Sequence, residues 1–276
     1  MWPTIGSLRT YLIFYLLSMV VHMWLAIRLC RERGVTWKAG FGLGLCYIWG
    51  MCVGARILYD LLNSRLDWRN YLDIGFYFSV GAWGGPLAYL AVAVIGILVL
   101  ARDRRMMLDV VVLALPVPMI LAKVACFVNG CCYGAESTVP WAMALADGAR
   151  GPAGIPRHST PLYEILVLVV ITVVFAKLDQ HRWKGTLVAW FVLLYGLGRP
   201  LTELFRATNE LRMPIGPFSA SQVTCLAAAC VAALSIPFLR PRCGIPKTPT
   251  ACRGSGFSQR SRSETQDEGL GTSRSM

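Results

Sequence analysis

The protein has 276 residues, of which 55% are hydrophobic and only 15% are charged, and its mean hydropathy is +0.53. Soluble domains carry about a quarter charged residues, so this composition excludes a typical water-soluble enzyme. Lys and Arg outnumber Asp and Glu by 27 to 15. In a soluble protein that excess would indicate nucleic-acid binding, but here the basic residues lie between long apolar runs, which indicates membrane topology.

Seven apolar runs are long enough to be candidate spans, since a helix needs about 20 apolar residues to cross a bilayer. They occupy residues 8–27, 39–62, 71–100, 106–128, 160–176, 185–203 and 218–239. We expect the first run to be a retained helix, because no small-residue cleavage site follows it. The third run is too long for one straight crossing and contains Gly-Gly-Pro, so we expect its first half to be broken or re-entrant. The sequence therefore predicts an all-α polytopic membrane protein with about seven transmembrane helices.

The basic residues alternate between the two ends of these spans. Most of them fall in the loops 28–38, 102–105 and 177–184 or after residue 239. Cytoplasmic loops are enriched in Lys and Arg, so this side is expected to be cytoplasmic. The amino terminus then lies outside and the carboxyl terminus inside, which is also the parity that seven spans require.

Composition changes after residue 240, where Ser, Arg, Thr, Gly and Pro replace the apolar residues. Such a segment cannot bury enough apolar surface to fold by itself. We therefore expect residues 1–240 to form the transmembrane domain and residues 241–276 to form a disordered basic cytoplasmic tail.

Ionisable side chains within a span are costly unless they are paired, hydrated or used. Arg199 and Glu203 lie four residues apart at the end of the sixth run, and Arg206 continues the same helical face at i+7. Two cations around one carboxylate leave positive charge for an anion such as a lipid phosphate. The alternative is a set of internal salt bridges that fixes helix packing, and for Arg56 with Asp60 the two interpretations are equally good.

Small and polar residues directly follow the fourth run, which contains Lys123. Asn129, Gly130 and Gly134 indicate backbone exposed to a cavity, because backbone facing lipid would lack hydrogen-bond partners. The longest outer loop begins here and extends to about residue 159, so the end of this run is a candidate binding site.

Two adjacent cysteines in the same segment, Cys131 and Cys132, suggest a metal pair or a redox site. Neither is favoured, because adjacent cysteines are poorly placed to ligate one Zn²⁺ and the only nearby histidine is His158. We therefore expect no metal site. His158 lies beside Arg157 at a helix entry, which makes both candidate contacts for an anion.

The sequence of residues 123–134 is Lys-Val-Ala-Cys-Phe-Val-Asn-Gly-Cys-Cys-Tyr-Gly. It resembles the central signature of the bacterial prolipoprotein diacylglyceryl transferases, approximately Arg-Ile-Gly-x-Phe-x-Asn-Gly-x-x-Tyr/Trp-Gly. Lys123 stands where the family has arginine. Five further segments are similar to family segments in the same order, at 54–59, 81–85, 157–164, 195–206 and 219–222. Trp83 stands where some members carry histidine.

The resemblance implies a seven-span enzyme of the bacterial inner membrane that needs no cofactor. Its substrates would be phosphatidylglycerol, which donates a diacylglyceryl group, and preprolipoproteins, whose lipobox cysteine thiol accepts it with release of glycerol phosphate. Positioned cations would neutralise the leaving phosphate.

The resemblance also implies roles for particular residues. Lys123 and Arg199 would clamp the phosphate, Glu203 would orient the arginines, and His158 or Arg206 would assist deprotonation of the thiol. The lipid and phosphate would further contact Asn129, Gly130, Gly134, Arg157, Arg56 and Tyr59.

Two alternatives stay open from the sequence. One is a catalytically altered or inactive member that acts as a lipid-binding membrane protein, or a transporter, although no inverted repeat supports a transporter. The other is a transferase that uses a different thiol acceptor.

Overall fold

The computed structural model describes residues 4–5, 8–54, 57, 85–147, 151–178, 185–206, 214–215 and 218–239. All of them belong to one compact unit, Met1–Pro241. The remaining unit, Arg242–Met276, lies outside the described residues, so the tail expected at 241–276 stays a prediction.

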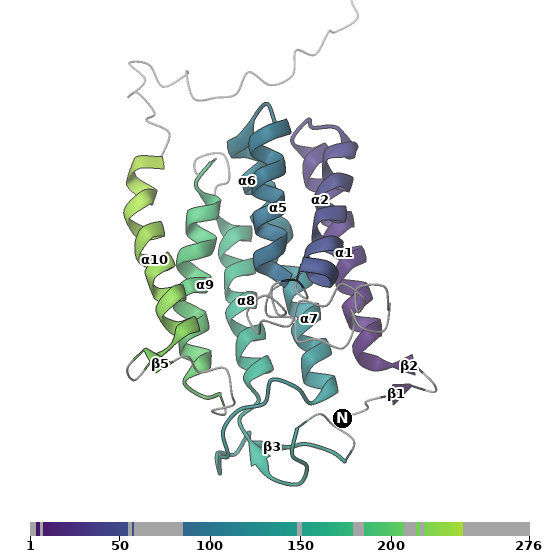
Figure 1. Ribbon diagram of the computed structural model, residues 1–276, viewed down its shortest axis with the longest axis vertical. Coiled ribbons are helices and arrows are strands. Elements are labelled where there is room, and N and C mark those ends of the chain that lie inside the picture. The colour runs from purple at the N-terminus through teal and green to yellow at the C-terminus, as the bar shows by residue number, and fades with distance from the viewer. Residues whose placement is uncertain are drawn as a thin grey trace, which may run out of the picture. The chain divides into compact units, whose positions relative to one another are not determined.

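The described part of the unit is built from helices that run alongside one another (Figure 1). The helices are α1 (Thr10–Glu32), α2 (Trp37–Trp49), the π-helical turn η1 (Gly50–Gly54), α5 (Gly85–Leu100), α6 (Arg104–Ala114), α7 (Pro116–Asn129), α8 (Thr160–Lys177), α9 (Leu187–Glu203) and α10 (Ala220–Leu239). Short antiparallel pairs join β1 (Thr4–Ile5) to β2 (Leu8–Arg9), β3 (Met143–Ala144) to β4 (Pro156–Arg157), and β5 (Pro214–Ile215) to β6 (Phe218–Ser219).

Four stretches of the described residues are long and apolar enough to cross a membrane: Thr10–Glu32, Arg104–Asn129, Thr160–Lys177 and Ser221–Leu239. They coincide with the first, fourth, fifth and seventh predicted runs. The second stretch combines α6 and α7, because Leu115 between them keeps right-handed helical dihedrals. Pro116 then opens α7, where its missing N–H costs little.

The other three predicted spans correspond to shorter helices. Run 39–62 is represented by α2 and η1, run 71–100 by α5, and run 185–203 by the 17-residue α9. The first half of run 71–100 lies outside the described residues. The protein is thus an all-α multi-pass membrane protein, and its count of seven spans stays a prediction.

The exposed faces of the helices are apolar, which is the reverse of a soluble bundle. Val20 on α1, Leu166 on α8 and Leu234 on α10 are each more than 60% exposed. Helices approach closely where side chains are small: a Cβ on Gly40 of α2 would lie 2.5 Å from the Ile27 Cα of α1. Lipid-facing surfaces and small residues at helix contacts are both typical of membrane bundles.

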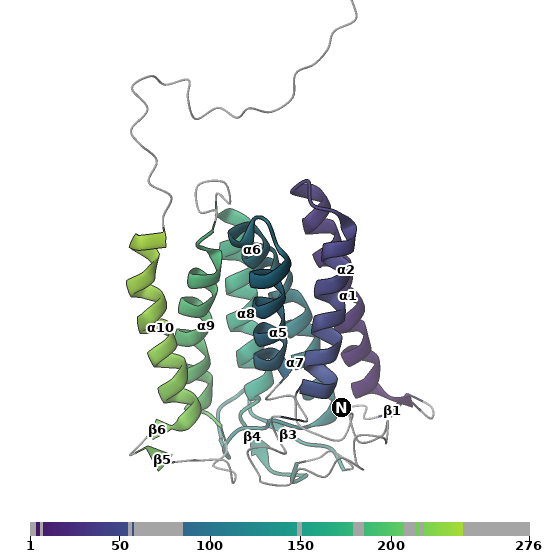
Figure 2. The same ribbon diagram turned by 45° about the horizontal axis from the view of Figure 1, so that its top comes forward.

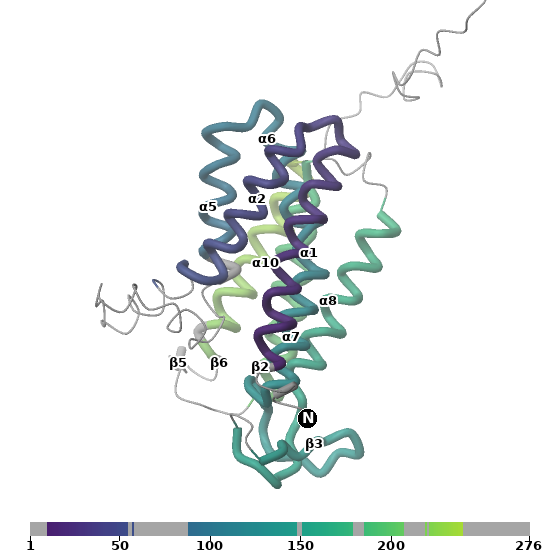
Figure 3. Tube along the Cα trace, turned by 90° about the vertical axis from the view of Figure 1, so that its right-hand side faces the viewer, coloured from purple at the N-terminus to yellow at the C-terminus, as the bar shows by residue number. Residues whose placement is uncertain are grey.

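The connections between helices that the structure describes in full fall at two opposite ends of the unit. Those from α1 to α2 and from α5 to α6 lie at one end, and the segment between α7 and α8, with β3 and β4, lies at the other (Figures 2 and 3). Two of the basic loops, 28–38 and 102–105, therefore share an end, as the charge pattern predicts. The candidate site residues gather near the opposite end.

Candidate functional site

Five charged side chains form one continuous group, which we call the charge network: Lys123 of α7, Glu164 of α8, Arg199 and Glu203 of α9, and Arg206 just after α9. The Lys123 Nζ of α7 lies 2.5 Å from Glu164 Oε2 of α8. Arg199 Nη1 of α9 lies 3.8 Å from Glu164 Oε1 and 2.6 Å from Glu203 Oε2. Glu203 Oε2 is also 3.6 Å from Arg206 Nη1. Glu164 thus links the two cations that the family resemblance assigns to the phosphate.

Burial in the charge network is greatest in its middle. The side chains of Glu164 and Arg199 are 2% and 7% exposed, whereas Lys123 at one end is 20% exposed and Arg206 at the other is 24% exposed. Three cations share two carboxylates within this group of described residues. The group therefore carries one positive charge in excess, with its most accessible cation at Arg206.

The position of Arg206 differs from the prediction. The helical period placed Arg199, Glu203 and Arg206 on one helical face, but α9 ends at Glu203. Arg206 instead forms an antiparallel bridge with Gly134, and its N–H donates to the Glu203 carbonyl over 3.1 Å. A turn that continues from α9 keeps Arg206 beside Glu203, and the bridge to Gly134 ties that turn to a distant segment.

That pairing forms a small main-chain frame around Gly134. The N–H of Gly134 donates to the His158 carbonyl over 2.8 Å, and the N–H of Ala135 donates to the Phe205 carbonyl over 2.9 Å. The Thr160 hydroxyl donates to the Cys132 carbonyl. The end of α7, the start of α8 and the end of α9 are thereby held together.

His158 lies inside this frame and has an aromatic environment. Its Nδ1 is 2.9 Å from the hydroxyl of Tyr163, which also accepts a hydrogen bond from Trp141 Nε1 over 2.9 Å. The imidazole packs against Phe205 at a centroid distance of 5.1 Å. The hydrogen bond to Tyr163 fixes the ring orientation, which suits a group that must transfer a proton in one direction.

Arg157 is committed to contacts within the outer segment. Its Nη2 lies 2.7 Å from Glu136 Oε1, and its guanidinium lies 5.4 Å from the centre of the Tyr133 ring. A pocket opens beside it, lined by Phe127, Cys131, Tyr133, Met143 and His158 among others. Arg157 thus borders this pocket and does not join the charge network.

The remaining predicted residues divide into two sets. Gly130 ends α7 in the left-handed conformation, with φ 67°, and its N–H caps the helix, while its predicted contact with the lipid stays a prediction. Asn129 is half-buried in the last turn of α7. Arg56, Tyr59 and Trp83 lie outside the described residues, so their predicted roles stay predictions.

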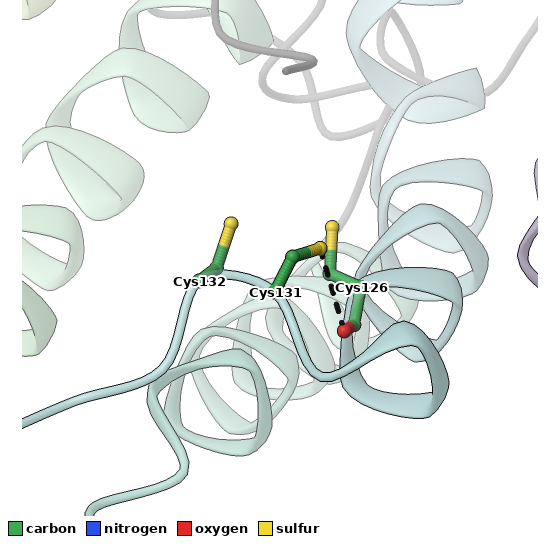
Figure 4. Close-up of side chains that lie close together, drawn as sticks. All are labelled: Cys126, Cys131 and Cys132. Carbon is green, nitrogen blue, oxygen red and sulfur yellow. Dashed lines mark hydrogen bonds between the residues drawn. The ribbon is translucent and has the colours of Figure 1, made fainter. Parts of the chain in front are cut away.

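The adjacent cysteines are arranged differently from the expectation. The Sγ atoms of Cys126, Cys131 and Cys132 all lie within 4.8 Å of one another (Figure 4). Cys132 has a φ of 59°, which is the left-handed region. The argument that neighbouring cysteines are poorly placed to ligate one metal ion therefore does not hold for this backbone. Hydrogen bonds from Cys126 and Cys131, with the charges of Lys123 and Arg206, hold the pKa of the Cys132 thiol well below its usual value.

Two residues of the site received no role from the sequence. Glu164 opens the fifth apolar run, and a carboxylate in that position is a signal, because such a group needs a cation. The contact between Tyr163 and His158 depends on how the outer segment folds back onto α8, which the sequence does not indicate. The one signal in the sequence is that the two residues lie five positions apart on either side of the start of a helix.

Gly134 should tolerate no side chain, because a Cβ there would lie 2.6 Å from the His158 Cβ and 2.7 Å from its carbonyl oxygen. We expect Gly134→Ala to lower the free energy of unfolding by about 1–3 kcal/mol and to disturb the frame that carries His158. Thermal unfolding in detergent measures the loss. Gly96→Ala on α5, where nothing lies within 4 Å, is the matched control and should have little effect. Equal stability of both variants would contradict the packing argument.

Comparisons with known proteins match this chain to one family. The family model described as prolipoprotein diacylglyceryl transferase matches residues 3–237. The chain is 27% identical to the phosphatidylglycerol–prolipoprotein diacylglyceryl transferase of Geobacter sulfurreducens, over 78% of this chain and 84% of that protein. It is also 27% identical to the same enzyme of Erwinia tasmaniensis, over 80% and 84% of the two chains, and 26% identical to that of Nitratidesulfovibrio vulgaris, over 81% and 88%.

Proposed function

Because this chain belongs to the prolipoprotein diacylglyceryl transferase family, we propose that its charge network binds the phosphate of the donor lipid during that transfer. The protein is a transferase that moves a diacylglyceryl group from phosphatidylglycerol to prolipoproteins.

One observation carries the proposed role of the network. Its members are largely buried, yet they hold one more cation than carboxylates, and the most accessible cation is Arg206. A phosphodiester would supply the missing negative charge. In a site of low dielectric, such preorganised cations stabilise a developing phosphate charge far better than water does. Ion pairs with a purely structural role would not need a cation in excess of the carboxylates.

The reaction is a displacement at a glyceryl carbon. The sulfur of a lipobox cysteine forms a C–S bond as the C–O bond to the phosphate breaks, and glycerol phosphate leaves with the bonding electron pair. Arg199 and Arg206 would stabilise that leaving group, with Glu203 orienting both guanidinium groups and Glu164 holding Arg199 and Lys123. The thiol proton must go to a base, and we assign it to His158, whose ring is oriented by Tyr163.

Lys123 should be a weaker phosphate ligand than the arginine of the family signature, because an ammonium makes a point contact and a guanidinium makes two parallel ones. We expect Lys123→Arg to preserve or raise transferase activity and Lys123→Ala to lower it at least tenfold. Specific activity of purified variants measures both. Unchanged activity in Lys123→Ala would show that Lys123 only balances the charge of Glu164.

We propose that the protein lies in the bacterial inner membrane with seven spans and with its basic loops in the cytoplasm. Thr36 in the α1–α2 connection and Thr138 in the outer segment are both exposed, so each can be changed to cysteine in a background without native cysteines. An impermeant maleimide added to spheroplasts should label Thr138→Cys and should leave Thr36→Cys unlabelled until the cells are lysed. The opposite pattern would reverse the proposed orientation.

The proposed function is tested in cells by complementation. A strain depleted of its own transferase should regain growth and lipoprotein maturation when this chain is expressed. If the unmodified chain is present in the membrane fraction and lipoproteins still do not mature, the proposed function is contradicted.

A further inference from the structure

Three cysteine thiols meet at the end of α7, and the transfer reaction uses none of them. Cys126 lies in the last turn of the helix, and Cys131 and Cys132 follow its glycine cap. Figure 4 shows the thiols of Cys126 and Cys131 close together, with Cys132 next to Cys131 on the segment that leaves the helix. In the part of the chain that the structure describes, this is the one group of three or more potential metal ligands that is found.

The local backbone holds these thiols in place. The N–H of Cys131 donates to the Cys126 carbonyl over 3.1 Å, and the Cys131 thiol donates to the same oxygen over 3.5 Å. Cys132 is the one residue other than glycine with a positive φ in the described segments, and its carbonyl accepts a hydrogen bond from Thr160. A left-handed conformation at a residue other than glycine persists only where the surroundings fix it. The three sulfurs are therefore preorganised.

We propose that Cys126, Cys131 and Cys132 form a binding site for one soft metal ion, Cu(I), held as three thiolates. Metal–sulfur bonds of roughly 2.3 Å around one ion place the sulfurs about 4 Å apart, and the sulfurs here lie within 4.8 Å of one another. Shifts below an ångström would thus close the site. Thiolates select Cu(I) or zinc, but structural zinc takes four ligands, whereas this cluster offers three, which suits three-coordinate Cu(I).

Charge and access both favour this site. Binding breaks three S–H bonds, forms three Cu–S bonds and releases three protons to solvent, with no change in oxidation state. The resulting cluster is anionic, and Lys123 lies one helical turn before Cys126 on α7. An entry route exists, because Cys131 lines the pocket that also contains Phe127 and His158.

The test measures Cu(I) binding to the full-length protein in detergent under reducing, oxygen-free conditions, in competition with the chelator bathocuproine disulfonate. We expect one Cu(I) per protein and an X-ray absorption spectrum with three sulfur neighbours. The triple variant Cys126→Ser, Cys131→Ser, Cys132→Ser should lose this ion. Two control variants should keep it: Cys225→Ser with Cys230→Ser on α10, and Cys243→Ser with Cys252→Ser.

Several results would overturn the proposal. They are the absence of binding by the wild type, binding retained in the triple variant, loss in either control, and oxygen or nitrogen neighbours in the spectrum. If the triple variant is not monodisperse, the single variant Cys132→Ala replaces it and should weaken binding at least a hundredfold. None of these readouts depends on transferase activity, so failure of the metal site and failure of the proposed function are distinguishable.

Discussion

Replacing Glu164 by glutamine should destabilise the protein more than any other single substitution in the charge network. The change leaves Lys123 and Arg199 without the carboxylate that they share, and that carboxylate is 2% exposed. Removing one partner of a buried ion pair costs roughly 3–5 kcal/mol, because the remaining charge stays desolvated. We therefore expect a large fall in the thermal midpoint and in the monodisperse fraction after purification in detergent.

A matched control for Glu164 lies on the surface of α1. Glu32 accepts from Arg28 over 2.8 Å, and their side chains are 50% and 59% exposed. Glu32→Gln should cost at most about 1 kcal/mol. The double variant Lys123→Gln with Glu164→Gln should be less destabilised than the sum of the two single variants, since it removes both members of one pair. Wild-type stability of Glu164→Gln would show that the carboxylate does not hold the network together.

Replacing Arg199 by alanine should produce the largest loss of activity per folded molecule. Its guanidinium lies at the centre of the network, between Glu164 and Glu203. Removing one preorganised donor to a developing anion costs roughly 2.7–4 kcal/mol, which is a factor of about 10² to 10³ in turnover. Arg199→Lys should recover part of the loss, because an ammonium keeps the charge but not the bidentate geometry.

Stability and catalysis have to be separated for Arg199, because its removal also takes one cationic partner from each of two carboxylates, Glu164 and Glu203. Specific activity is therefore measured only on monodisperse protein. Glu203→Gln should do intermediate harm, since it loosens Arg199 and Arg206 without deleting either. Arg28→Ala, an exposed cation at the other end of the unit, should keep full activity. Normal turnover per folded molecule in Arg199→Ala would end its catalytic assignment and leave it as a packing residue.

The helices were predictable from sequence because membrane spans are marked by length and apolarity alone. α8 and α10 begin and end within about two residues of their predicted runs, α1 (Thr10–Glu32) continues past the end of its run at residue 27, and α6 with α7 fills the fourth. The interruption at Leu115 was not predicted. Spans with interior breaks are harder to predict from sequence, and the end of α2 is an example. The helix passes into the π-helical turn at Gly50, where a Cβ would meet the backbone of Tyr89.

The charged residues were predictable individually, but their partners were not. Arg199 with Glu203 follows from the helical period, because both lie on one helix at i and i+4. The link from Glu164 to both Lys123 and Arg199 depends on how α7, α8 and α9 pack, which no local pattern encodes. Arg206 lies past the end of α9, where a turn keeps it at i+3 from Glu203; the helical period therefore indicated the right neighbour but not the bridge to Gly134.

The direct test of the central claim is a transferase assay on the purified protein. Phosphatidylglycerol carrying a radiolabel in its diacylglyceryl group is mixed with a lipobox peptide, and the same peptide with its cysteine changed to serine is the control. We expect the label to appear in the cysteine peptide through a thioether, with one glycerol phosphate released for each transfer, and to be absent from the serine peptide. Label transfer to neither peptide by monodisperse wild-type protein would contradict the account.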